Sequence, residues 1–105
     1  MININVDLSK WKIKIDGHAN FDKEGKDIVC AAISTLFYTL CITLEEYKKG
    51  LKIFKTEDAK GNGCVIAKPK PEFEQNIAIV FMTICHGFEL IAMEYSDYVK
   101  FTIKE

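Results

Sequence analysis

A histidine and a cysteine, separated by a short polar segment, are the residues of this chain best suited to chemistry. Cys30 stands three residues after Asp27, which we expect to cap the start of a helix, so the thiol falls in the first helical turn. Backbone N–H groups and the positive end of the helix dipole there favour a thiolate over a thiol. The thiolate is the nucleophile, so position singles out Cys30. The alternative is a small buried apolar residue, the commoner role of cysteine.

His18 directly follows Gly17, at the point where a predicted strand ends. The loop that it begins, residues 18–26, is polar and irregular, and Gly25 gives it a pivot. Such a loop can return the chain so that the imidazole approaches Cys30, takes the thiol proton and later gives a proton to a leaving group. The alternative is a solvent-exposed histidine without a role.

Asp27 and Ser34 are the candidate supporting residues. Asp27 has two possible tasks, capping the helix and orienting the imidazole of His18, and capping requires no further coincidence. Ser34 lies four residues after Cys30 and shares its helix face. Its hydroxyl could donate a hydrogen bond to His18, to a substrate or to no partner, and its alternative role is to allow close helix packing. We expect Gly17 and Gly25 to act as hinges of the loop.

The other cysteines are weaker candidates. Cys41 is surrounded by apolar residues, Cys64 has no basic residue nearby, and Cys85 and His86 are adjacent in a helix, so their side chains point about 100° apart. The four cysteines show no CxxC spacing, so we expect neither a disulfide framework nor a zinc site. The chain has no phosphate-binding motif.

Hydrophobic periodicity predicts seven elements. Apolar and polar residues alternate with a period of two in the predicted strands, whereas two long segments without internal proline have helical character. The predicted strands are 2–7, 11–16, 51–57, 64–70 and 98–103, and the predicted helices are 27–49 and 72–95. The segment 58–63 (DAKGNG) reads as a turn. The order ββαββαβ predicts an α/β (α+β) fold in which two helices pack on one face of a mixed sheet.

Length and composition predict one soluble domain over residues 1–105. The apolar content of 49% is that of an ordinary globular protein, and the net charge of −1 gives no reason to expect direct nucleic-acid binding. The first residues contain no long apolar run, so we expect no signal peptide, no membrane partner and a cytoplasmic location.

Both predicted helices are more apolar than one buried stripe requires. The first carries apolar residues around much of its circumference, including Leu36, Tyr38 and Leu40. Two explanations remain open: the helices are covered on both sides, or part of their surface meets a second copy in a homodimer.

The segment between residues 17 and 34 closely resembles the signature of the ribosomal-processing cysteine protease (Prp) family. The matching residues are Gly17-His18-Ala19, Gly25, Asp27-Ile28-Val29-Cys30-Ala31-Ala32 and Ser34. The chain also agrees with the family in length and in its order of elements.

This resemblance implies a specific activity. Members of the family remove a short N-terminal extension from ribosomal protein twenty-seven of the large subunit, so the expected partner is an N-terminal peptide of that protein. The resemblance implies that His18 and Cys30 are the catalytic dyad, that Asp27 and Ser34 support them, and that the loop moves aside for the peptide. It also implies a homodimer and no metal or cofactor.

Three functions therefore stand side by side. The leading hypothesis is an endopeptidase in which Cys30 attacks a peptide carbonyl and backbone N–H groups of the first helical turn stabilise the oxyanion. The rivals are a non-catalytic ribosome-associated binding module and a thiol-based redox sensor. The lack of a resolving cysteine near Cys30 in the sequence weakens the sensor.

Overall fold

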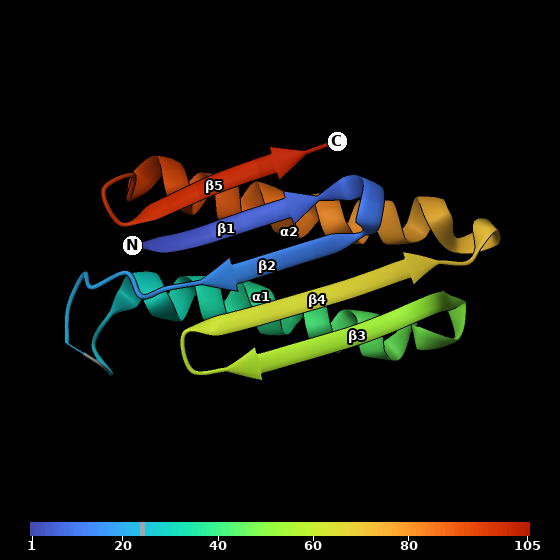
Figure 1. The fold of residues 1–105 in the computed structure, drawn as a ribbon, viewed down its shortest axis with the longest axis horizontal. Helices are drawn as coiled ribbons and strands as arrows, with labels where there is room; N and C mark the ends of the chain where they lie inside the picture. The colour runs from blue at the N-terminus through green and yellow to red at the C-terminus, as the bar shows by residue number, and fades with distance from the viewer. Residues whose placement is uncertain (24) are drawn as a thin grey trace.

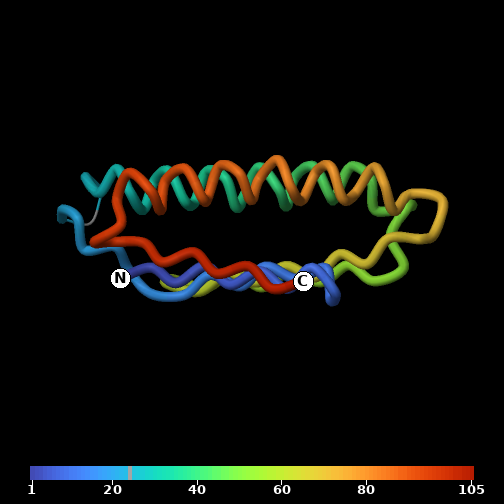
Figure 2. The backbone as a smooth tube through the Cα atoms, turned by 90° about the horizontal axis from the view of Figure 1, so that it is seen from above, coloured from blue at the N-terminus to red at the C-terminus, as the bar shows by residue number. Residues whose placement is uncertain are grey.

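The chain folds into two layers, a five-stranded sheet and a pair of helices that cover one of its faces (Figures 1 and 2). The structure is a computed structural model and describes residues 1–23 and 25–105. Glu24, which belongs to the predicted loop 18–26, lies outside the described residues. The predicted arrangement of two helices on one face is confirmed.

The sheet is mixed, as predicted. Its strands lie in the order β3-β4-β2-β1-β5, with β1 and β5 parallel and all other neighbours antiparallel. The bounds are β1 Ile2–Asp7, β2 Lys12–Asp16, β3 Leu51–Ala59, β4 Asn62–Pro69 and β5 Val99–Lys104. The first two strands are antiparallel neighbours joined by the short 3-10 turn Leu8–Lys10, which confirms the predicted pair.

Strand register follows from the alternation of apolar side chains. In β1 and β2 the register places Ile4 opposite Ile15 and Val6 opposite Ile13, and all four are buried. Successive side chains of a strand point to opposite faces, so this register puts the apolar set under the helices and the polar set on the open face. A shift by one residue would reverse both faces.

The helices are α1, Ile28–Glu46, and α2, Glu74–Glu94. They lie antiparallel, and each buries one stripe of apolar residues against the sheet (Figure 2). The α1 stripe is Val29, Ile33, Phe37, Leu40 and Leu44, and the α2 stripe is Ile77, Phe81, Ile84, Cys85 and Phe88. Both helices are shorter than predicted, because the 3-10 turns Lys48–Gly50 and Pro71–Phe73 occupy the predicted helix ends.

The connection between β3 and β4 is tighter than its sequence predicts. The predicted turn 58–63 shrinks to Lys60 and Gly61, with Ala59 paired to Asn62. Gly61 has φ +79°, a value that glycine adopts without strain, so one glycine is enough to reverse the chain. Asp58 consequently lies in a strand, at a defined register position.

The outer faces of both helices are uncovered in the single chain. Large apolar side chains there are mostly exposed, among them Ile42 (64%), Ile79 (62%), Leu90 (60%) and Met93 (73%). The first of the two explanations, that the chain itself covers the helices on both sides, is therefore wrong. By length and composition α1 and Pro71–Glu94 would also suffice to cross a membrane, a test that core helices of soluble proteins pass as well.

Candidate active site

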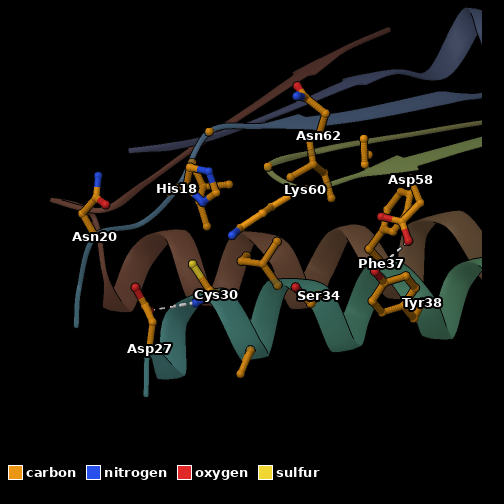
Figure 3. A pocket seen from close by; sticks show the side chains of 18 of the residues that line it. His18, Asn20, Asp27, Cys30, Ser34, Phe37, Tyr38, Asp58, Lys60 and Asn62 are labelled. Atoms are coloured by element: carbon orange, nitrogen blue, oxygen red, sulfur yellow. Dashed lines mark hydrogen bonds between the residues drawn. The ribbon is translucent and has the colours of Figure 1, made fainter. Parts of the chain in front are cut away.

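A cleft opens at the end of the sheet where β2 ends, α1 begins and the β3–β4 hairpin turns (Figure 3). Its volume is about 850 Å³. All six residues singled out in the sequence line it: Gly17, His18, Gly25, Asp27, Cys30 and Ser34. The tertiary structure thus brings together residues that the sequence places up to seventeen positions apart.

Cys30 projects from the first turn of α1 into this cleft, on the side where the imidazole of His18 lies (Figure 3). Its side chain is half-buried, so the sulfur is held in place yet accessible from the cleft. The nearby thiol is one of the groups that hold the pKa of the Asp27 carboxyl below its usual value.

Asp27 is the buried polar residue of the site and accepts hydrogen bonds from four backbone N–H groups. Oδ1 accepts from Val29 and Cys30, each at 3.0 Å, which confirms the predicted helix cap. Oδ2 accepts from Phe21 at 2.9 Å and Asp22 at 3.4 Å in the preceding loop. Burial by itself would raise the pKa of Asp27, but the hydrogen bonds from these N–H groups outweigh it and the pKa is lowered.

These hydrogen bonds bear on two expectations for the site, the oxyanion donors in the first helical turn and the orientation of His18 by Asp27. The N–H groups of Val29 and Cys30 point to Asp27 Oδ1, and that of Ala31 donates to the Asp27 carbonyl at 3.0 Å. The helix cap therefore already takes the Val29 and Cys30 donors of the predicted oxyanion site, and the oxyanion site itself stays a prediction. A carboxylate has about four lone-pair positions, so four accepted bonds also leave Asp27 no capacity to orient His18.

His18 is exposed and rests against the β3–β4 hairpin. The backbone N–H of Gly17 donates to the carbonyl of Gly61 at 2.9 Å, which ties the start of the loop to the turn. A Cβ atom on Gly61 would lie 2.8 Å from His18 Nε2, so the ring occupies the space that only glycine leaves open. Among the described residues no hydrogen bond joins His18 to Cys30, and catalytic hydrogen bonds are often long before substrate binds.

The two predicted hinge glycines both have positive φ, +94° at Gly17 and +86° at Gly25. At Gly17 a side chain would also collide with the carbonyl oxygen of Met1. These conformations explain why glycine stands at both positions, whereas the hinge motion itself stays a prediction.

An aromatic contact holds the loop against the far helix. The ring of Phe21 packs edge-on against Tyr95, with centroids 5.5 Å apart, and against Tyr98, at 5.1 Å. The loop is therefore fixed twice, by its N–H groups on Asp27 and by this ring on the end of α2 and the start of β5.

Ser34 lies one turn beyond Cys30, and its hydroxyl forms no hydrogen bond with another described residue, which leaves it available to a bound peptide.

The opposite wall of the cleft was not predicted. It consists of the hairpin residues Asp58, Lys60 and Asn62. Two further lining residues were not predicted either, Asn20 from the loop and Tyr38 from α1. Tyr38 could have been found, because it continues the row of Cys30 and Ser34 at a spacing of four.

The remaining cysteines differ from Cys30. Burial raises the pKa of both Cys41 and Cys85 to about 11, helped by the charge of Asp58 and of Glu89 respectively, so both are neutral thiols at pH 7. All four cysteines are free. Within residues 1–23 and 25–105, no group of three or more His, Cys, Asp or Glu side chains could hold a metal ion.

Comparison with known proteins identifies the family. A family model described as cysteine protease Prp matches residues 1–100. The chain belongs to the Prp family of cysteine proteases. The resemblance of residues 17–34 to the Prp signature is thereby confirmed.

The Prp relatives share both length and fold with this chain. The ribosomal processing cysteine protease Prp of Mycoplasma genitalium is 28% identical over 96 residues, which are 91% of each chain. The crystal structure of Prp from S. aureus with a covalently linked product peptide has a TM-score of 0.77 and 20% identity, covering 99% of this chain and 100% of that one. Prp from S. aureus with a substrate peptide has a TM-score of 0.72, 17% identity and the same coverage.

Removal of the Asp27 charge should destabilise the protein in a pH-dependent way. At pH 7 we expect Asp27→Ala to lower the free energy of unfolding by about 1–2 kcal/mol through loss of the cap. We expect Asp27→Asn to lower it as well, because the amide keeps one acceptor oxygen for the helix but places an NH2 donor against the loop N–H groups that now donate to Oδ2. The pKa of Asp27 is lowered from 3.8 in the folded state, so its stabilising effect is complete well above pH 3.8 and is lost as the pH falls through the lower folded value. Urea unfolding at pH 7 and pH 3 measures both effects.

The exposed Asp97→Asn variant is the control, since its stability should stay within about 0.5 kcal/mol of the parent. An Asp27→Asn variant as stable as the parent at pH 7, or a difference that grows toward pH 3, would contradict the role given to this carboxylate.

Gly61→Ala should displace the imidazole of His18. The new methyl carbon would lie only 2.8 Å from Nε2, and a ring at the end of a side chain moves more easily than the backbone. Shifts of the His18 ring signals in NMR spectra measure the displacement, and those of the exposed His86 serve as an internal reference.

Gly25→Ala is the matched control, because Gly25 also has positive φ but a Cβ there would meet nothing within 4 Å. Both variants carry similar backbone strain, and only Gly61→Ala should move the His18 signals. Unchanged His18 signals in that variant would contradict the contact.

Proposed function

We propose that the protein is an endopeptidase in which Cys30 is the nucleophile and His18 the general base and acid. The observation that carries the proposal is the shared cleft: in a cysteine protease of the Prp family, His18 and the half-buried Cys30 line the same cavity. Cys41 and Cys85 are excluded as nucleophiles by their raised pKa values, and Cys64 is not among the residues that line the cleft.

The reaction proceeds in two halves. His18 takes the proton of the Cys30 thiol, and the sulfur attacks the carbonyl carbon of the scissile peptide bond. The protonated imidazole then gives that proton to the leaving amine as the C–N bond breaks, which leaves a thioester on Cys30. In the second half His18 takes a proton from water and the hydroxide attacks the thioester carbonyl. The C–S bond then breaks, the carboxylic acid product leaves, and the Cys30 thiolate regains its proton from His18.

Substrate entry requires the loop to yield. Phe21 and Asp22 donate to Asp27 from the loop, while Val29 and Cys30 donate from the helix. Opening of the loop breaks the first pair of bonds and leaves the helix cap intact, so the thiol keeps its position while the cleft widens. Oxyanion donors would come from the walls of the cleft, where the Ser34 hydroxyl lies one turn from Cys30.

The substrate that we propose is the N-terminal extension of ribosomal protein twenty-seven of the large subunit. The support is that the Mycoplasma genitalium relative is named a ribosomal processing protease. The cytosol is the proposed location, because a thiol nucleophile stays reduced there.

Cleavage of a peptide that spans this N-terminus should depend on both residues of the dyad. The parent protein should cut the peptide once, whereas Cys30→Ala should leave it intact and His18→Gln should slow cleavage at least about 100-fold. Mass spectrometry of the products gives the cut site and the rate. Cys64→Ala, which removes a thiol outside the cleft, should cleave like the parent. Cleavage by Cys30→Ala at the same site would refute the assigned nucleophile.

The proposal includes a homodimer formed through the outer faces of the helices. Ile42 on α1 and Ile79 on α2 are both more than half exposed, and apolar surface of this extent is characteristic of interfaces. A second copy would cover it, which is the second explanation for helices that are apolar on more than one side.

Sedimentation equilibrium tests the dimer. We expect a mass near twice the 12.0 kDa of one chain at tens of micromolar, and a shift toward one chain in Ile79→Glu, because a buried charge opposes association. Thr102→Glu adds the same charge to an exposed strand position and should leave the mass unchanged. A parent mass of 12.0 kDa would contradict the dimer.

A further inference from the structure

The end of the cleft away from His18 is closed by a tyrosine and an aspartate that the catalytic step does not use (Figure 3). Tyr38 lies on α1, two turns beyond Cys30 and in line with Ser34. Its phenol donates a hydrogen bond of 2.8 Å to Asp58 Oδ2 on β3. Both side chains are exposed to the cleft, and together they bridge the helix to the hairpin.

Packing below this pair holds it in place. Gly63 of β4, which pairs with Asp58, lies directly against Phe37, such that a Cβ on the glycine would be 3.0 Å from Phe37 Cζ. Phe37 is buried, and its ring centroid is 5.9 Å from that of Tyr38. The carboxylate of Asp58 therefore has a defined position rather than a freely moving one.

Asp27 and Asp58, two of the carboxylates that line the cleft, differ in what they can still bind. Asp27 is buried, and four N–H groups engage it. Among the described residues Asp58 accepts one hydrogen bond, from Tyr38, and it is exposed, so its Oδ1 and remaining lone pairs can accept donors from a ligand. Its negative charge reaches its neighbours, since the hydrogen bond to Asp58, burial and the charge of Asp58 together raise the pKa of Tyr38.

We propose that Tyr38 and Asp58 form a subsite for a lysine or arginine side chain of the substrate peptide. The cation would pair with Asp58 and lie near the face of the Tyr38 ring, two interactions that favour the same charge. Lys60 reaches from the hairpin toward the Cys30 side of the cleft, away from Asp58 (Figure 3). This inference rests on the proposed function, because it assigns part of the substrate of the same cleft.

Helix geometry places the basic residue along the peptide. Eight residues of α1 separate Cys30 from Tyr38, which corresponds to about 12 Å along the helix axis. An extended peptide advances about 3.3–3.6 Å per residue, so the subsite lies about three or four residues from the scissile bond. The catalytic pair and the subsite thus read separate positions of one peptide.

Peptides that differ at one position test the inference. Lysine, glutamine or glutamate is placed three or four residues from the scissile bond, on either side, and kcat/KM is measured for each peptide. We expect the parent to prefer lysine over glutamate at one of these positions by about three- to tenfold, as for a partly exposed ion pair. Asp58→Asn should abolish this preference, and Asp58→Lys should reverse it.

Matched variants separate the subsite from general charge effects. Glu57→Gln removes the same charge one residue away, but Glu57 pairs with Cys64 on the open face of the sheet and its removal should keep the preference. Tyr38→Phe removes the hydroxyl that positions Asp58 and should weaken the preference without reversing it. The inference would be overturned if the parent and Asp58→Lys had the same preference between lysine and glutamate at all four peptide positions, three and four residues from the scissile bond on each side.

A binding measurement distinguishes this inference from the proposed function. Fluorescence anisotropy of the same peptides with Cys30→Ala reports binding without cleavage. Binding that depends on lysine and on Asp58, with no cleavage by the parent, would support the subsite and refute the endopeptidase. Cleavage without any Asp58-dependent preference would support the endopeptidase and refute the subsite. The absence of both binding and cleavage would refute the two proposals together.

Discussion

The buried carboxylate of Asp27 joins the two segments that carry the proposed dyad. One of its oxygens binds the first turn of α1 beside Cys30, and the other binds the loop that begins at His18. A buried charge is tolerated only when its hydrogen bonds are satisfied, so helix start and loop must adopt compatible positions. The placement of Cys30 and the path of the loop are therefore one constraint rather than two.

The β3–β4 hairpin contacts the His18 ring, which Asp27 does not. Gly61 takes the Gly17 N–H and leaves room for the His18 ring, while Gly63 packs against Phe37 further along α1. The same hairpin thus supports the imidazole at one end of the cleft and presents Asp58 at the other. Gly61 in the tight turn and Gly63 in β4 each bring backbone close to a side chain, which no larger residue would permit at either position.

The charges of the cleft follow this division of labour. The oxygens of Asp27 accept hydrogen bonds from backbone N–H groups, so this residue acts on the local structure and on the position of the thiol. Asp58 keeps accepting capacity toward the open cleft. A chain with a net charge of −1 can therefore still present a localised negative site to a cationic peptide.

The strands and helices were predictable from the sequence because their signals are local. Alternation in β1 and β2 and the long apolar stripes of α1 and α2 are readable without knowledge of any partner. The ends were less predictable. The 3-10 turns Lys48–Gly50 and Pro71–Phe73 replaced predicted helix, and the predicted six-residue turn became two residues because β3 and β4 continue pairing to Ala59 and Asn62. Helix ends and turn lengths depend on tertiary neighbours that the sequence does not display.

The sequence by itself determined the nucleophile candidate, its cap and the family signature between residues 17 and 34, since each depends on residues close together in the chain. Only the tertiary structure decided the rest of the cleft. It placed the hairpin opposite α1, set Gly61 against the ring of His18, and set Asp58 beside Tyr38. The physical reason is that these contacts span segments far apart in the chain, and the order of strands in the sheet decides which segments meet.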